Sequence, residues 1–308
     1  MAPKGAVIEV AGLSKRFGAR GSPQAVQAVK DLSFRATPGR VMGFLGPNGS
    51  GKTTTLAMIL ELVRPDSGHA TVDGQPYSSL ERPATIVGSA LSPAFHPGHT
   101  GLAHLQIMQR GMGLAPTAVD EALELVGLRE AANRKTGGYS LGMRQRLALA
   151  GALLGNPGTL ILDEPANGLD PEGIRWMRQF LRHLAAEGRT ILLSSHLLAE
   201  VQQTVDDLVV IRKGERVFLG TPDELETGNG IGVESEDNDR LAQALRQAGA
   251  TVEAREGDRL RVAGMDALGV GRLARDAGIA LGYLAQERTG LEDRFFQLIN
   301  DTTPGEDS

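Results

Sequence analysis

The chain has 308 residues, enough for one large domain or two of ordinary size, and its apolar share of 41% allows a sizeable core. With 32 basic and 37 acidic residues, the formal net charge of -5 argues against a protein that coats nucleic acid. The absence of cysteine excludes disulfides and thiolate metal sites, which fits a reducing compartment.

Strand-like and helix-like patterns alternate over the first two thirds of the chain. The expected strands, apolar or alternating, lie at 6–17, 29–37, 40–46, 158–165, 190–196 and as a pair within 207–220, and residues 68–77 are expected as a hairpin or an edge strand. The expected helices lie at 51–62, 101–114, 117–128, from near Met143 to 154, and at 171–188, 197–205 and 221–226. This alternation predicts an α/β fold with a mostly parallel sheet, and the helical run at about 92–150 predicts an inserted subdomain.

A new pattern begins near residue 231 and predicts a second, smaller domain. The expected elements are a strand at 230–235, a helix at 237–249, a hairpin at 251–262 that turns at 256–258, a helix at 265–278, a strand at 279–285 and a closing helix at 290–300. The order β-α-β-β-α-β is that of the ferredoxin-like α+β arrangement. We therefore expect domains at 1–228 and 231–300, with a linker at 227–230 and a frayed tail at 301–308.

The sequence contains no apolar run long enough to cross a bilayer. The longest candidate, residues 147–155, is about half of the ~18 residues that a span requires. The start of the chain also lacks the long apolar stretch of a signal peptide. We expect the chain by itself to be soluble, so that a role at a membrane needs a partner.

Residues 46–53 carry the strongest chemical signal, because they match G-x-x-x-x-G-K-[ST] between an expected strand and an expected helix. Glycines let the backbone N–H groups turn toward a phosphate, and the helix N-terminus adds partial positive charge. Lys52 can reach the β- and γ-phosphate oxygens, and the Thr53 hydroxyl can bind Mg²⁺. The expected nucleotide-binding residues are Gly46, Pro47, Asn48, Gly49, Ser50, Gly51, Lys52, Thr53 and Thr54.

Two carboxylates follow the apolar run of residues 160–162. Asp163 and Glu164 are expected at the carboxyl end of a buried strand, where open α/β sheets bind ligands. Asp163 is the candidate Mg²⁺ ligand, and Glu164 is the candidate group that polarises the attacking water. An acidic helix cap before Pro165 is the alternative interpretation, which the phosphate-binding motif upstream makes the weaker one.

With these motifs in order, the chain resembles the ATP-binding subunit of an ABC transporter. Residues 139–154 resemble the signature of that family, usually Leu-Ser-Gly-Gly-Gln, of which Ser140 and Gly142 are kept while Leu141 and Met143 depart. The resemblance implies an ABC-type P-loop ATPase in which two subunits enclose two ATP molecules. The signature of each subunit would contact the γ-phosphate held by the other. A helix N-cap at Ser140 accounts for the same residue, and both roles can hold together.

Three further positions take their roles from this resemblance. Asp170 matches the loop that crosses the dimer interface, His196 matches the switch residue at the γ-phosphate, and Phe17 matches the ring that stacks on adenine. Phe17 is also explained as an ordinary strand hydrophobe, and the loop at 18–25 leaves its contact open. Lys52, Glu164 and His196 are therefore the expected catalytic residues.

One departure from the family lies between the ATP core and the helical insert. The family has a Gln or Glu there that contacts Mg²⁺ and the lytic water, but residues 86–100 contain no Gln, Glu or Asp. Leu91 occupies the place, flanked by Ser89 and Ser92. We interpret this as slow or asymmetric turnover rather than as loss of ATP binding.

Residues 93–98 and the ferredoxin-like tail resemble one branch, the bacterial exporters of drugs, antibiotics or lipids. This implies a separate permease that docks on the helical insert near 86–100, a second ATP-binding subunit in a homodimer, and a place on the cytoplasmic face of the membrane. No nucleic-acid partner is expected. We interpret His96, His99 and His104 as a chance grouping rather than a metal site, since no carboxylate lies between them.

Two other functional classes remain open at this point. A soluble ATPase of the same superfamily could act on ribosomes or DNA, although such proteins commonly carry two cassettes or special insertions. A nucleotide-gated regulatory module with little turnover would fit the missing Gln, whereas Glu164 and His196 speak against it.

Overall fold

The computed structural model describes residues 3–18, 25–91, 94–226, 229–254, 259–288 and 291–300. The chain divides into two compact units, Met1–Pro222 and Asp223–Ser308. Parts of several expected features lie outside the described residues: most of the loop at 18–25, Ser92, part of the linker at 227–230, the hairpin turn at 256–258 and the tail at 301–308.

Two sheets form the frame of the first unit. The larger sheet has the strand order β5-β6-β7-β3-β8-β9, from β3 (Val41–Leu45), β5 (Val87–Ala90), β6 (Thr159–Leu162), β7 (Thr190–Ser195), β8 (Asp207–Arg212) and β9 (Glu215–Gly220). All of these neighbours pair in parallel except β8 and β9. Every residue of β3, β6 and β7 is buried, as expected for parallel strands covered on both faces.

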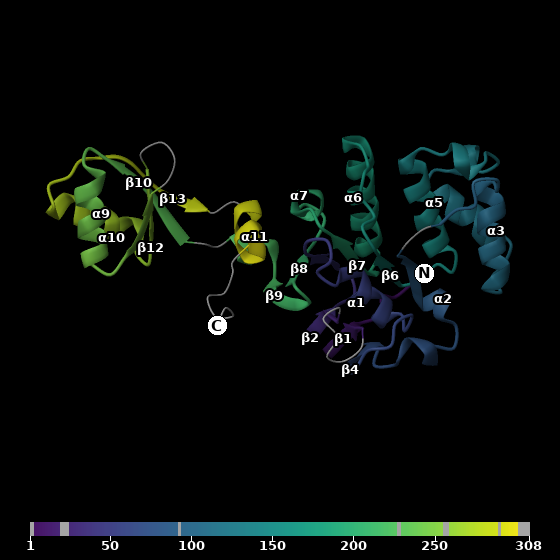
Figure 1. The fold of residues 1–308 in the computed structure, drawn as a ribbon. Coiled ribbons are helices and arrows are strands. Elements are labelled where there is room, and N and C mark those ends of the chain that lie inside the picture. The colour runs from purple at the N-terminus through teal and green to yellow at the C-terminus, as the bar shows by residue number, and fades with distance from the viewer. Residues whose placement is uncertain are drawn as a thin grey trace. The chain divides into compact units, whose positions relative to one another are not determined.

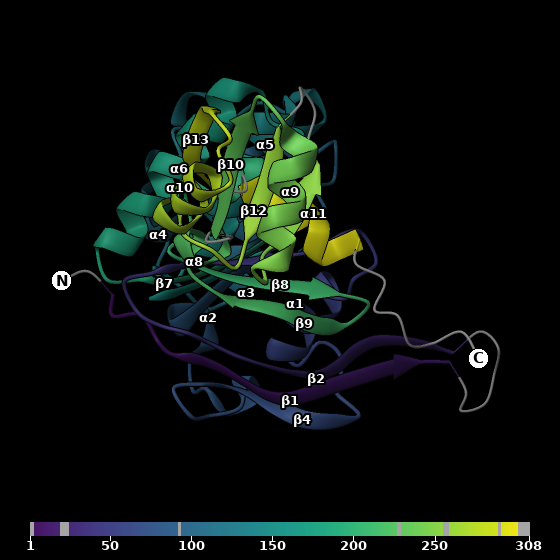
Figure 2. The ribbon, with the colours of Figure 1, turned by 90° about the vertical axis from the view of Figure 1, so that its left-hand side faces the viewer.

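The smaller sheet is antiparallel, with the order β2-β1-β4 from β1 (Ile8–Phe17), β2 (Val26–Ala36) and β4 (Ser67–Val72). Figure 2 shows it as a layer below β8 and β9 of the larger sheet. Helix α1 (Lys52–Ile59) joins the two sheets in one core, which includes Leu13, Phe34, Phe44 and Leu56. This core fixes the loop between β3 and α1.

The helical insert consists of α3 (Gly101–Gly111), α4 (Thr117–Leu125) and α5 (Leu141–Leu153), which pack against one another, and α5 lies beside β5. Figure 1 shows α3 and α5 at one end of the first unit. Helix α5 begins at Leu141 rather than near Met143, because the Ser140 hydroxyl accepts the Met143 N–H at 3.2 Å and caps the first turn. The long amphipathic helix α6 (Pro171–Ala186) follows the 166–170 loop.

Short helices complete the chain: α2 (Pro83–Ile86), α7 (Leu198–Val201), α8 (Pro222–Glu226), and the 3₁₀ turns η1 (Tyr77–Ser79), η2 (Arg129–Ala131) and η3 (Thr136–Gly138). The helix expected at 51–62 ends earlier, at Ile59, and Glu61 adopts the left-handed conformation with φ 54°. The segment 68–77, expected as a hairpin or an edge strand, contains β4, which pairs with β1 at the edge of the smaller sheet, and a tight turn that brings Gln75 back to Val72.

The second unit is a four-stranded antiparallel sheet with the order β11-β12-β10-β13. Its elements are β10 (Asn229–Ser235), α9 (Asn238–Gln247), β11 (Thr251–Ala254), β12 (Leu260–Ala263), α10 (Ala267–Asp276), β13 (Leu281–Arg288) and α11 (Leu291–Asn300). The sheet packs on α9 and α10 around a core that contains Val233, Leu241, Val262 and Val270. The order β-α-β-β-α-β with this pairing is ferredoxin-like.

Candidate nucleotide site

The loop between β3 and α1 forms a tight turn at the carboxyl edge of the larger sheet. Gly51 has φ 103°, and a Cβ there would lie 2.2 Å from the Ala28 carbonyl oxygen, so only glycine fits. A Cβ on Gly46 would lie 2.5 Å from the Ile211 carbonyl oxygen. The hydroxyl of Ser50 is buried and has no hydrogen-bond partner among the described residues. This compact, amide-rich turn has the form that binds phosphate.

Lys52 lies almost entirely within the protein, with 6% of its side chain exposed. Its ammonium donates to the carbonyl of Gly46 at 2.7 Å and to that of Pro47 at 3.2 Å. It also lies 3.3 Å from Oε1 of Glu164. The loop carbonyls therefore hold the ammonium over the turn, beside the carboxylate that sequence analysis assigned to water activation.

Asp163 is the first residue after β6, and its N–H donates to the Ala90 carbonyl at the end of β5. The hydroxyl of Thr53 donates to Oδ2 of Asp163 at 2.6 Å. The hydroxyl of Ser194 donates to Oδ1 of the same carboxylate. Two hard oxygen donors, from Thr53 and Asp163, thus meet at the start of α1, which is the kind of donor that Mg²⁺ prefers.

Glu164 adopts the left-handed conformation, with φ 51°, and its N–H donates to the Ser194 hydroxyl at 3.0 Å. Its carboxylate lies between two nitrogen groups. Oε2 is 2.5 Å from Nδ1 of His196, and Oε1 faces Lys52. The structure therefore brings together Lys52, Thr53, Asp163, Glu164 and His196, the residues for which sequence analysis proposed chemical roles.

Ser194 is the member of this cluster that sequence reasoning missed. It is fully buried at the end of β7, where the parallel register pairs Leu162 with Leu193 and so places Ser194 beside Asp163. The signal in the sequence was a hydroxyl two residues before His196, at the end of a strand expected next to the one that carries the carboxylates.

A second group of predicted residues lies on the loops before α5 and α6. Ser140 caps α5, and Asp170 caps α6 by accepting the Gly173 N–H at 2.8 Å. A Cβ on Gly168 would lie 2.6 Å from Leu141, so the two loops pack against each other. The residues Lys52, Thr53, Asp163, Glu164 and His196 are called the Lys52 cluster below. Among the described residues, no hydrogen bond or ion pair joins this cluster to Ser140, Gly142 or Asp170.

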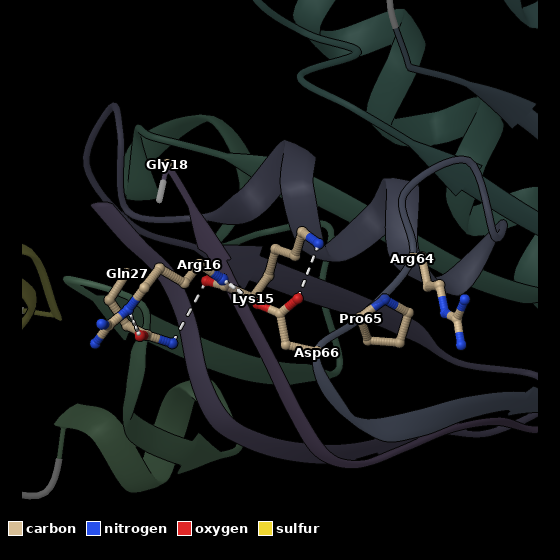
Figure 3. A pocket seen from close by; sticks show the side chains of 7 residues that line it. All are labelled: Lys15, Arg16, Gly18, Gln27, Arg64, Pro65 and Asp66. Carbon is tan, nitrogen blue, oxygen red and sulfur yellow. Dashed lines mark hydrogen bonds and ion pairs between the residues drawn. The ribbon is translucent and has the colours of Figure 1, made fainter. Parts of the chain in front are cut away.

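Phe17, the predicted adenine-stacking residue, ends β1 with 45% of its surface exposed, and the Lys15 ammonium lies 5.6 Å from its ring centre. Next to it is a cavity of about 690 Å³ (Figure 3), lined by Lys15, Arg16, Gly18, Gln27, Arg64, Pro65 and Asp66. Asp66 pairs with Lys15 at 3.1 Å and accepts the Arg16 N–H at 2.7 Å. The lining of the cavity is mostly polar and includes none of the residues of the expected phosphate-binding turn.

Leu91, the residue at the family's Gln position, directly follows β5 and packs against the core. It lines a cavity of about 200 Å³ between the end of β5 and the helices α3 and α5, together with Phe95, His104, Met108 and Leu147. Ser89 is exposed, and Ser92 lies outside the described residues. The seam between sheet and insert is therefore largely apolar at this point.

In the part of the chain that the structure describes, no group of three or more His, Asp or Glu side chains is arranged so that it could hold a metal ion. This includes His96, His99 and His104. His96 packs on His99, and His104 meets the edge of Phe95. Burial lowers the pKa of His104 below its usual 6.5, and the nearby His99 lowers it further. Their arrangement is one of ring packing.

No helix within the described ranges has the length and apolar character that a membrane span needs.

A family model described as "ABC transporter" matches residues 29–167, and a second, described as a domain of unknown function, matches residues 229–292. The chain is 40% identical to the uncharacterized ABC transporter ATP-binding protein YdbJ of Bacillus subtilis, over 68% of this chain and 67% of that protein. It is 39% identical to the bacitracin transport ATP-binding protein BcrA of Bacillus licheniformis, over 68% of each. It is also 39% identical to the Nod factor export ATP-binding protein I of Burkholderia lata, over 71% and 72%.

Solved structures are similar over the first unit. An ATP-binding subunit of an ABC transporter superposes with a TM-score of 0.61 at 26% identity, over 71% of this chain and 92% of that one. The dimeric cassette MJ0796 superposes with a TM-score of 0.63 at 23% identity, over 70% and 98%, and this likeness shows the fold alone. The predicted ABC-type P-loop fold is confirmed.

Proposed function

The chain belongs to the ABC transporter family as an ATP-binding, ATP-hydrolysing subunit, and from this premise we propose that it powers the export of antibiotic-like or lipid-like compounds through a separate permease. The export direction is supported by a relative named for Nod factor export, and the antibiotic class by a relative named for bacitracin transport. The single observation that carries the chemistry is the contact of Glu164 with both Lys52 and His196 at the phosphate-binding turn.

The site residues divide the work of phosphoryl transfer. Backbone N–H groups of the Gly46–Thr53 turn and the start of α1 bind the phosphates of ATP. When ATP binds, the Lys52 ammonium leaves the loop carbonyls and Glu164 and binds phosphate oxygens. It does so because its electrostatic attraction to the multiply charged triphosphate is stronger than its attraction to these groups. Glu164, relieved of that ion pair, accepts a hydrogen bond from water in line with the γ-phosphate, and His196 fixes the orientation of the carboxylate.

Thr53 and Asp163 are the residues that would hold Mg²⁺, since both present oxygen donors at the start of α1. When bound, the ion would neutralise charge that develops on the phosphate oxygens. Asn48 belongs to the same turn and Thr54 to the first turn of α1, and both are proposed to contact phosphate as well.

We propose that Ser140, Gly142 and Asp170 serve a second copy of the chain. They lie on two loops that pack together, and none is bonded to the Lys52 cluster of its own chain. A helix cap with free N–H groups suits a phosphate presented from outside. In this arrangement two subunits enclose two ATP molecules, and closure of the dimer moves the permease.

ABC ATP-binding subunits work with membrane permeases, and the helical insert is the proposed docking surface. The apolar seam around Leu91 and Phe95 supports this choice, because it lies between sheet and insert. The permease would hold the chain at the cytoplasmic face of the membrane. Leu91 lacks the polar group that the family places near the lytic water, so we propose slow turnover.

The test is export from vesicles that contain the chain and a co-expressed candidate permease. Loaded compounds of the antibiotic and lipid classes should leave the vesicles only with Mg·ATP, and Lys52→Met should abolish export. ATP hydrolysis that responds to no exported compound, while ribosomes or DNA stimulate it, would assign the chain to a soluble ATPase.

A further inference from the structure

Ser194 lies fully buried at the carboxyl end of β7, and it contacts both carboxylate residues of the site through one hydroxyl group. The neighbouring strand β6 ends at Leu162, which pairs with Leu193. The register therefore places Ser194 directly beside Asp163. A hydroxyl offers one donor and two acceptor positions, and this one uses the donor and one acceptor toward different residues.

The donor side fixes Asp163. Ser194 donates to Oδ1, while the Thr53 hydroxyl donates to Oδ2 at 2.6 Å. With a partner on each oxygen, the carboxyl plane of Asp163 cannot rotate freely. Asp163 and Thr53 are the residues proposed to hold Mg²⁺, so the Ser194 bond sets the orientation of the carboxylate that would bind the ion.

The acceptor side fixes the backbone of Glu164. Its φ of 51° is the left-handed conformation, which is unfavourable for residues with a Cβ. The 3.0 Å bond from the Glu164 N–H to Ser194 is the contact that holds this N–H. The same turn directs the carboxylate to His196 and Lys52. The geometry points to Ser194 as a positioning residue for ATP hydrolysis, which aligns Asp163 and Glu164 with each other. This role rests on the proposed function.

A purely structural role is the competing explanation, since a buried hydroxyl also stabilises a fold. The chain offers a matched control on the same strand. Thr190, at the amino end of β7, is also fully buried, and its hydroxyl donates to the Ala6 carbonyl at 2.7 Å, far from the site. Removing either hydroxyl should cost similar stability, but only Ser194 touches the two carboxylate residues.

The experiment compares Ser194→Ala, Ser194→Thr and Thr190→Val with the wild-type chain, in vesicles with its permease. Ser194→Ala should lower kcat by about 10- to 100-fold and leave KM for ATP within about threefold. Ser194→Thr keeps the hydroxyl and should restore most of kcat. Thr190→Val should match the wild type in kcat, with a melting temperature lowered as much as that of Ser194→Ala.

A second readout uses the protein without nucleotide or Mg²⁺. Hydrogen exchange of the peptide that contains β6 and Glu164 should be faster in Ser194→Ala, because the Glu164 N–H loses its acceptor. Thr190→Val should leave exchange in that peptide unchanged. Ser194→Thr should exchange as the wild type does if the added methyl group fits, and its melting temperature reports whether it does.

The outcomes separate the two claims. If Ser194→Ala hydrolyses ATP as fast as the wild type, or loses no more activity than Thr190→Val, the positioning role is wrong while the proposed function stands. Unchanged exchange at Glu164 in Ser194→Ala overturns it as well. If the wild-type chain shows no ATP hydrolysis with its permease, the proposed function fails and the positioning role fails with it.

Discussion

His196 lies against Glu164, with Nδ1 of the imidazole 2.5 Å from Oε2 of the carboxylate. The two residues come from adjacent strands of the larger sheet, and both follow the carboxyl ends of those strands. The other oxygen of the same carboxylate faces Lys52. Glu164 is thus held at both oxygens, and each of the three residues makes a separate, measurable contribution.

Replacing Glu164 by Gln should stop hydrolysis and keep ATP binding. The amide has nearly the same shape but cannot take a proton from water, and loss of such a group typically lowers rates by about 10²–10⁴-fold. Phosphate release measures kcat, and titration of ATP measures affinity. The exposed Glu9 on β1 provides the control, since Glu9→Gln should leave both values unchanged. A Glu164→Gln chain with wild-type kcat would contradict the assignment.

Lys52→Met should weaken ATP binding as well as hydrolysis, because it removes the charge that meets the phosphates and frees Glu164 of its ion pair. The expected loss of affinity is at least about tenfold, since charge-assisted bonds contribute about 1.5–3 kcal/mol. The exposed Lys30 pairs with Glu215 at 2.5 Å, outside the site, so Lys30→Met should bind ATP normally. Equal affinity in the two variants would exclude a phosphate contact for Lys52.

Leu91→Gln should raise the rate of phosphate release. It places a side-chain amide where the ABC transporter family carries a Gln near the lytic water. Leu91 is half-buried, so the substitution should cost about 1 kcal/mol of stability. Leu62 is 69% exposed, and Leu62→Gln controls for the general effect of adding a polar group. Identical rates for Leu91→Gln and the wild-type chain would show that this position does not limit turnover.

The stability of the first unit should fall as pH decreases through the His104 titration range. Burial lowers the pKa of His104 in the folded chain, so the unfolded chain binds the proton more readily. This contribution to stability is therefore fully present above the unfolded pKa of about 6.5 and decreases over the pH interval below that value. In His104→Gln, the melting temperature should depend less on pH over this interval. His69 is exposed on β4, so His69→Gln should leave the pH dependence of the melting temperature unchanged. Parallel curves for His104→Gln and the wild type would contradict the prediction.

The second unit should lose stability without affecting nucleotide binding when its own core is damaged. Leu241 on α9 is fully buried, so Leu241→Ala should cost about 2–5 kcal/mol. Leu268 on α10 is 70% exposed, and Leu268→Ala should be near neutral. Calorimetry should show an unfolding transition whose midpoint temperature is lower in Leu241→Ala than in the wild-type chain and unchanged in Leu268→Ala. The affinity for ATP should be the same in all three chains. A matching loss of ATP affinity would mean that the two units do not fold separately.

Sequence patterns predicted the elements best where neighbouring residues decide them. The Gly46–Thr53 turn and the strand before Asp163 were predicted from local chemistry, and the structure places both at one edge of the larger sheet. Boundaries were less accurate. Residues 68–77 were expected as a hairpin or an edge strand. The structure makes β4 an edge strand, and its partner β1 could not be predicted because it lies more than fifty residues away in the chain, beyond the reach of a local pattern.

The amino-acid sequence by itself determined which chemical groups are available: a phosphate-binding turn with Lys52 and Thr53, two carboxylates after a buried strand, and an imidazole after another. Only the tertiary structure decided how these groups meet. Ser194 orients Asp163 and Glu164 because the parallel register of β6 and β7 brings together residues 31 and 30 positions apart. The Glu164 N–H, in a residue with left-handed backbone, likewise finds its acceptor on the neighbouring strand, and local sequence patterns cannot indicate a partner so far away in the chain.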